Sequence, residues 1–187
     1  MNFNPYKDSI LLTILKIWTF FLIVFASTNS YAQSERARTN IGLVYPLSSN
    51  WTQAPRDTNS FSLNLIAGVS AAERGVSLAG FSNIVRHDTR GLQIAGFSNH
   101  IGGNAWGTMF AGFLNTYSSG NNVAVAGFAN IARSSSGAQI AGFLNKGGDV
   151  SSLQIAGFSN IARNVKGAQI AGFMNVAKKV KGVQVAA

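Results

Sequence analysis

The chain of 187 residues contains no cysteine, three prolines and two histidines. Without cysteine it cannot form a disulfide, a catalytic thiolate, a Cys-ligated zinc site or a lipid-modified N-terminal cysteine. Two histidines and six scattered acidic residues give no cluster with the spacing of a zinc or calcium site. No glycine-rich stretch has the lysine and spacing of a phosphate-binding loop. We therefore expect no catalytic residues, no metal and no cofactor, and we predict a non-enzymatic protein.

The sequence also lacks a long apolar run. The longest, residues 17–26, is preceded by Lys7 and Lys16 and followed by a polar segment that ends in Ser30-Tyr31-Ala32. A transmembrane helix needs about 20 apolar residues, so an uncleaved anchor is the less favoured interpretation. The small residues at 30 and 32 fit a signal-peptidase site. We expect residues 1–32 to be a signal peptide and Gln33 to begin an exported chain.

Acidic residues are few. The chain has 15 Lys and Arg against 6 Asp and Glu, a formal charge of +9 at pH 7, while 47% of its residues are apolar. This apolar content is high enough to bury a core, so we expect an ordered protein. The excess of positive charge favours anionic partners.

Glycine, by contrast, is abundant, and it stands in a short motif, Ala-Gly-Phe-X-Asn, that occurs seven times. The steps between its glycines are 16, 16, 15, 15, 15 and 15 residues, and such fixed-period self-similarity indicates a repeat architecture. Positions are numbered below from this glycine, so that the phenylalanine is +1 and the asparagine +3. The motif glycines are Gly80, Gly96, Gly112, Gly127, Gly142, Gly157 and Gly172.

The residues before each glycine alternate in polarity. Positions −4 and −2 are mostly large and apolar, and position −3 is Gln in five copies. Alternation of period two is typical of a strand, and we expect the apolar residues inside and the Gln residues outside. Further apolar positions at +4 and +8 are also expected inside. Inward positions about five residues apart are typical of a three-sided coil.

These patterns predict an all-β fold, a parallel β-solenoid with one coil of about 15 residues per repeat. In such a stack each residue lies above its own copy, so the Phe residues stack and the glycine permits close backbone approach. The +3 side chains form a structural ladder of amides, each donating to one neighbour and accepting from the other. The ladder residues are Asn83, Asn99, Asn115, Asn130, Asn145, Asn160 and Asn175.

An alternative fold is an antiparallel sheet or a set of outer-membrane β-barrel strands, because a 15-residue unit can supply the roughly 9 to 11 residues of a spanning strand. The direction of the Phe side chains distinguishes the two folds. Outward Phe residues would form an exposed apolar stripe, and strict alternation does not decide their direction. They are Phe81, Phe97, Phe113, Phe128, Phe143, Phe158 and Phe173.

The chain outside the motif divides into three parts. Residues 33–40 are polar and are predicted to be a flexible N-terminus. Residues 41–74, with expected strands at 41–45 and 60–65, are predicted to be an N-terminal β cap on the repeat domain, residues 75–187. Ala187 stands where the next glycine is due, which is consistent with a truncated repeat domain. The open C-terminal coil predicts end-to-end self-association.

The repeat resembles the surface-repeat proteins of Leptospira and Bacteroidetes, whose units read Gly-X-Gln-Ile-Ala-Gly-Phe/Leu-X-Asn. The matching segments include residues 91–99, GLQIAGFSN, and 167–175, GAQIAGFMN. The resemblance covers about residues 60–187 and concerns a largely uncharacterised family. It implies an exported protein of the outer membrane, cell surface or periplasm of a Gram-negative-type bacterium.

The basic residues are the one candidate contact surface. In a stack they would form a stripe that suits anionic envelope components such as lipid, lipopolysaccharide or glycan. Export makes nucleic acid an improbable target. The simpler interpretation is a solvated corner that keeps the repeats soluble. The residues of this predicted basic stripe are Arg133, Arg163, Lys166, Lys178, Lys179 and Lys181.

The function expected from the sequence is therefore a structural or interaction role, with a rigid rod displaying a regular surface in the cell envelope. The first alternative is a segment of an outer-membrane β-barrel. A less favoured alternative is ice binding, since flat solenoids can carry regular arrays, but the threonine rows expected of an ice-binding face are missing.

Overall fold

The structure is a computed structural model that describes residues 38–187. The predicted signal peptide and residues 33–37 lie outside the described residues. The elements are β1 (Arg38–Val44), β2 (Leu47–Ser48), the 3-10 helix η2 (Trp51–Arg56), β3 (Thr58–Ser70), β4 (Ala72–Ala79), β5 (Ser82–Val85), β6 (Thr89–Ala95), β7 (Ser98–Ile101), β8 (Ala105–Ala111), β9 (Leu114–Tyr117), β10 (Asn122–Ala126), β11 (Ala129–Ala132), β12 (Ser134–Ser135), β13 (Gln139–Ala141), β14 (Leu144–Lys146), β15 (Asp149–Val150), β16 (Leu153–Ala156), β17 (Ser159–Ala171) and β18 (Met174–Ala186).

Residues 38–187 form a parallel β-solenoid of about nine turns, as the repeat predicts. Each strand pairs in register with its counterpart one repeat later, for example Ile140 with Ile155. The pairing of β1 with β2 is antiparallel, and every other pairing between these strands is parallel. The alternative of an antiparallel sheet or barrel strands is therefore wrong.

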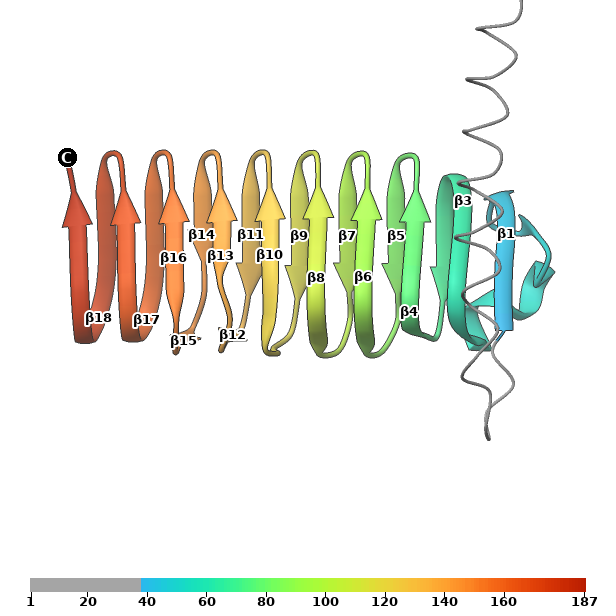
Figure 1. Cartoon of the computed structure of the whole chain (residues 1–187), viewed down its shortest axis with the longest axis horizontal. Helices are drawn as coiled ribbons and strands as arrows, with labels where there is room; N and C mark the ends of the chain where they lie inside the picture. Colours follow the sequence, from blue (N-terminus) through green and yellow to red (C-terminus); the bar gives the residue numbers. More distant parts are fainter. Residues whose placement is uncertain (1–37) are drawn as a thin grey trace, which may run out of the picture. The chain divides into compact units, whose positions relative to one another are not determined.

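Each coil has two long sides, which we call the front wall and the back wall. The front wall contains β4, β6, β8, β10, β13 and β16, extended by β1, β3, β17 and β18. The back wall contains β5, β7, β9, β11 and β14, extended by the later part of β3 and the earlier parts of β17 and β18. Figure 1 shows the two walls as two layers of strands, one behind the other. A short third side, β12 and β15, closes the later coils.

The motif glycine lies in the bend that joins the two walls. A Cβ atom on Gly142 would lie 2.2 Å from the carbonyl oxygen of Gly127 in the preceding coil. The same approach, 2.0 to 2.3 Å, recurs at every motif glycine. Side chains are excluded there because the backbones of successive coils approach too closely, as the sequence predicted.

Inside the back wall, the seven ladder asparagines hydrogen-bond from coil to coil. Each Nδ2 donates to the Oδ1 of the next Asn at 2.8 to 2.9 Å, from Asn83 through to Asn175. Each Nδ2 also donates to the backbone carbonyl of the −2 residue one coil later, as from Asn145 to Ile155 at 2.7 Å. These bonds satisfy the amides without water and hold successive coils in register.

Inside the front wall, a second ladder consists of glutamines. The Nε2 of Gln154 donates to Gln139 at 2.6 Å, Gln169 donates to Gln154 at 2.6 Å, and Gln184 continues the series at 2.5 Å. Gln139 donates in turn to the Tyr117 hydroxyl at 2.8 Å, where the ladder ends, because Ala124 and Met109 occupy the same column towards the N-terminus.

The expected direction of the side chains is therefore wrong at −4, −3, −2 and +4. Gln93, Gln139, Gln154 and Gln169 at −3 are fully buried, and only Gln184 in the last coil is exposed, whereas the large apolar residues at −2 and +4 point outwards. The interior is narrow and holds small residues, above all the Ala at −1, with Val150 and Val165 inward at +8 as predicted. Glutamine is accepted inside because the next coil supplies its hydrogen-bond partner.

The Phe side chains point outwards, which answers the question that alternation left open. Their exposures range from 38% at Phe113 and Phe158 to 60% at Phe173. Successive rings stack in parallel with centroids 4.7 to 5.0 Å apart, which is the spacing of the coils. Ring faces are thus covered by neighbouring rings, and mainly ring edges meet solvent.

The N-terminal coils join the same stack. β1 begins at Arg38, within the segment 33–40 that was predicted to be flexible. β3 pairs in parallel with β1, β4 and β5, so it supplies both a front strand and a back strand. Arg38 forms an ion pair with Asp57, which fastens the first strand to the loop before β3.

Candidate functional site

A long exposed apolar feature of the described chain is the outward −2 column of the front wall. Ten residues pair in succession along it, all of them apolar. Their exposures include 37% at Ile140, 43% at Phe110 and 52% at Val185. The column consists of Ile41, Leu63, Leu78, Ile94, Phe110, Val125, Ile140, Ile155, Ile170 and Val185.

The −4 column lies beside it on the same face and is nearly as apolar, because side chains two residues apart in a strand share a face. From Val76 to Val183 its one polar member is Thr108. Charged residues first occur two positions further back, at −6, where Arg90 lies 4.9 Å from the Trp106 ring and Lys166 pairs with Lys181. The four central coils carry Trp106, Asn121, Ser136 and Ser151 at −6, so the central part of the front wall is free of charge.

The outward +4 column of the back wall is mixed. It reads Val69, Ile84, His100, Thr116, Ile131, Lys146, Ile161 and Val176. The Nδ1 of His100 and the Thr116 hydroxyl, which lie in successive coils, form a hydrogen bond of 2.8 Å. Polar side chains therefore interrupt this column at three of its eight positions, so of the two walls only the front wall carries an uninterrupted apolar column. The stacked Phe residues form a further exposed apolar column at the bend between the walls.

The structure brings together only some residues of the predicted basic stripe. Lys166 pairs with Lys181, while Arg163 and Lys178 follow the paired residues Ala162 and Ala177. Gly148 stands between the backbones of Arg133 and Arg163, to both of which it hydrogen-bonds. The stripe is therefore continuous over the last two coils and interrupted before them.

One cation of the stripe is already paired. The Arg163 Nη2 donates to the Asp149 Oδ2 at 2.7 Å, and Asn164 donates to the Oδ1 at 2.6 Å. Hydrogen bonding from Arg163 and then Asn164 lowers the pKa of the Asp149 carboxyl, and the carboxylate raises the pKa of Arg163. The pair is exposed, so it reduces the local positive charge more than it stabilises the fold.

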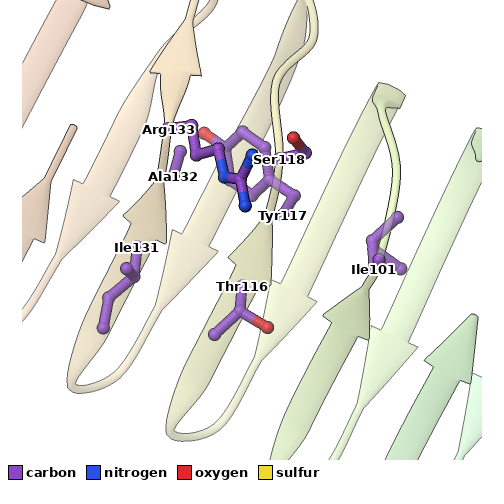
Figure 2. A pocket seen from close by; sticks show the side chains of 8 residues that line it. Ile101, Thr116, Tyr117, Ser118, Ile131, Ala132 and Arg133 are labelled. Carbon is purple, nitrogen blue, oxygen red and sulfur yellow. The ribbon is translucent and has the colours of Figure 1, made fainter. Parts of the chain in front are cut away.

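A shallow depression of about 320 Å³ lies at the ends of the back-wall strands β9 and β11. Figure 2 shows its lining, with Arg133, Tyr117 and Ser118 at one end and Thr116 and Ile131 at the other. The Tyr117 hydroxyl bonds instead to Ser135 at 3.2 Å and to Gln139 in the interior. The Tyr117 hydroxyl is therefore directed into the interior and away from the depression.

Among the buried ionisable groups of residues 38–187, Tyr117 and Glu73 have shifted pKa values. Burial raises the pKa of the Tyr117 hydroxyl, against the effect of its hydrogen bonds. Burial also raises the pKa of Glu73, whose Oε1 accepts from the Ser62 hydroxyl at 2.8 Å and from Asn59 at 3.2 Å. Both groups face other core residues, so their perturbed pKa values reflect core packing rather than a reactive site.

Two further observations concern the described residues as a set. Within residues 38–187, no three His, Asp or Glu side chains are placed where they could share a metal ion. In the same range, no helix has the length and apolar character needed to cross a membrane.

Comparison of the chain with family models, with characterised proteins and with solved structures found no match.

Sequence reasoning missed the front wall as a candidate site because it placed the −2 residues inside. A signal was present at −1, where alanine occurs in all seven copies. Positions −1 and −3 share one face of the strand, and −2 and −4 share the other. A face with an invariable Ala suits a narrow interior, which leaves the face of larger residues outside.

Proposed function

We propose that this protein is a non-enzymatic, exported component of the bacterial cell envelope, with a structural or interaction role carried by the front wall. The observation that supports the proposal most strongly is the −2 column, ten successive apolar residues on the outside of a fold whose interior is lined by amides. Apolar surface of this extent is unfavourable in water unless another surface covers it.

The contrast with the back wall supports a role for the front wall in association. The coil accepts His100, Thr116 and Lys146 at outward positions of the back wall. Folding therefore does not require apolar residues at outward positions, and the uniform front wall is better explained by contact with a partner.

Fractionation and cross-linking in the exporting bacterium test this proposal. We expect the protein in the envelope fraction, accessible to protease from outside the cytoplasm, and captured in cross-linked species. The variant Ile140→Glu should be exported but lose those species. The matched control Ile131→Glu, on the back wall and of equal exposure, 38% against 37%, should retain them. A cytoplasmic protein, or equal behaviour of the two variants, would contradict the proposal.

A second candidate activity is contact with anionic envelope components through the basic residues of the last coils. Its support is the pairing of Lys166 with Lys181 and of Asn164 with Lys179, which groups cations at the C-terminal end. Binding to vesicles with anionic lipid should fall as salt rises and should weaken in Lys166→Ala with Lys181→Ala. Unchanged binding in that double variant would exclude the contact.

End-to-end association through β18 is a further possibility for self-assembly. The outer edge of this 13-residue strand has no partner within residues 38–187, and unpaired strand edges template further pairing. Ice binding receives less support, because the −2 column contains no hydroxyl group and the −4 column from Val76 to Val183 contains one, Thr108.

A further inference from the structure

We propose that the front wall is covered by the front wall of a second copy of this chain, so that two solenoids pack face to face. The inference rests on the proposed function, because it names the partner of the same surface. It differs from association through the edge of β18, which would extend the stack rather than cover a wall.

The first argument is the size of the surface. About nine coils spaced by ~4.8 Å, each contributing five residues of ~3.3 Å, give the front wall an area of roughly 700 Å². The largest apolar patch on a typical monomer is about 300 to 600 Å². Two such walls would bury about 1,400 Å² together, which lies within the 1,200 to 2,000 Å² of stable, specific interfaces.

The second argument is chemical. The centre of a stable interface is apolar and depleted of charge. The −2 column contains no charged or polar residue, and the −4 column from Val76 to Val183 contains one hydroxyl, that of Thr108. The charged residues Arg90, Lys166 and Lys181 stand at the edge of the wall, on either side of the four uncharged central coils. A second copy offers the same uncharged centre, and the cations of both copies would lie at the rim of the interface, where they stay in contact with solvent.

The third argument is geometric. The rows of the front wall repeat at the coil spacing, 4.7 to 5.0 Å as measured by the stacked Phe rings. A second copy has the identical spacing, so its rows can fit between those of the first along the whole wall. Facing sheets pack about 10 Å apart with interdigitated side chains, and identical sheets achieve this in dry interfaces.

A lipid bilayer fits the front wall less well. Membrane-bound surfaces place cations beside the apolar face, at the level of the headgroups. Arg90, Lys166 and Lys181 border the front wall, but position −6 is uncharged in the four central coils, and Arg133 follows β11 of the back wall. A bilayer on the front wall would therefore meet no row of cations along the central coils, so the observations favour a second copy.

Sedimentation velocity of the protein purified from the exporting cell, without detergent, tests the inference. We expect a dimer at micromolar concentration. Ile140→Glu should weaken dimerisation by at least about 100-fold, because it would place two unpaired carboxylates in an apolar interface. Ile131→Glu, placed beside Lys146 on the back wall, should dimerise like the wild type. Circular dichroism should show an unchanged strand signal in both variants.

A milder variant keeps the test decisive if Ile140→Glu fails to fold. Val125→Thr preserves the shape of the side chain and adds a hydroxyl to the same column, and it should weaken dimerisation several-fold. The inference would be overturned if the wild type is a monomer at all concentrations, or if neither Ile140→Glu nor Val125→Thr weakens the dimer.

The failures of the two proposals are distinguishable. A monomer in solution whose cross-linked species in cells still depend on Ile140 would retain the proposed function with a different partner. A monomer that binds vesicles of phosphatidylcholine, with Ile140→Glu abolishing the binding, would identify lipid as that partner and overturn the second-copy inference. Loss of the dimer in both glutamate variants alike would show that association does not depend on one wall, and would also overturn it.

Discussion

The front and back walls are built by the same coils, yet they present different surfaces. On the outside of the front wall the −2 column consists of ten apolar residues, whereas on the outside of the back wall the +4 column contains His100, Thr116 and Lys146 among its aliphatic residues. The backbone pairing is parallel and in register in both walls. The back wall thus shows which outward residues the coil tolerates, and the front wall shows a surface more apolar than folding requires.

The interiors of the two walls differ as well. Behind the back wall the Asn ladder runs unbroken through seven coils. Behind the front wall the Gln ladder spans the later coils and gives way to Ala124 and Met109, with Gln93 making no side-chain hydrogen bond within the described residues. The Asn ladder of the back wall therefore holds the coils in register, and the inward-facing positions of the front wall tolerate more kinds of residue.

The largest effect on stability is expected from substitutions in the two amide ladders. Asn145→Ala removes bonds to Asn130, Asn160 and the Ile155 carbonyl and should lower the free energy of unfolding by about 3 kcal/mol. Gln154→Met, which imitates Met109 in the same column, should cost about half as much. Thermal and denaturant unfolding of the two variants measure the difference. A greater loss of stability from Gln154→Met than from Asn145→Ala would contradict the view that the Asn ladder contributes more to stability than the Gln ladder.

The contrast between the outer surfaces can be reduced by one substitution. Lys146 separates Ile131 from Ile161 on the back wall, so Lys146→Ile creates an apolar run of four from Ile131 to Val176. We expect a second association, about tenfold or more above that of the wild type, at high concentration in sedimentation velocity. Lys146→Gln removes the same charge without adding apolar surface and serves as the control. If Lys146→Ile and Lys146→Gln associate equally, the effect comes from the lost charge and not from the added apolar surface.

A smaller effect concerns the carboxyl buried beneath the first front-wall strands. Burial raises the pKa of Glu73, so the folded protein binds this proton more tightly than the unfolded chain. The stabilisation is complete below the ordinary pKa of a glutamate and is lost as the pH rises through the raised value. Glu73→Gln should therefore be more stable than the wild type at pH 7, and the gain should shrink in acid. A pH-independent difference between the two unfolding curves would contradict this assignment.

The smallest effect is expected at the exposed corner below the back wall. Hydrogen bonding to Arg163 lowers the pKa of Asp149, so its stabilisation is present above the ordinary pKa of an aspartate and is lost as the pH falls through the lowered value. Asp149→Asn should unfold slightly more easily than the wild type at pH 7 and low salt. The difference should vanish in strong acid and diminish in high salt. A difference that persists at low pH would mean that Asp149 acts through packing.

The repeat alone was enough to predict the stack. Identical columns gain most from parallel register, and this argument gave the one-coil repeat, the stacked Phe rings and the close approach at Gly142. Inward side chains at +8, such as Val150 and Val165, were also predictable from spacing.

The prediction from the sequence was wrong about which side chains of each wall point outwards, because it assigned the large apolar residues to the inside. A 15-residue coil is too narrow for that assignment, and the amides of Gln139 and Gln154 can be buried because each finds its partner one coil away. Likewise, the spacing of Arg133 and Arg163 predicted a stripe. The same spacing places Gly148 at +6 between them, but it could not reveal that Asp149 pairs with Arg163.

The measurement that tests the account most directly compares two adjacent residues of β13. Ile140 is 37% exposed on the front wall, and Ala141 is 5% exposed in the interior. Ile140→Glu should fold, with its free energy of unfolding lowered by about 1 kcal/mol. Ala141→Glu should lose about 4 kcal/mol or fail to fold, because a carboxylate enters a narrow core. Equal losses, or a greater loss at Ile140, would contradict the outward front wall on which the proposed association depends.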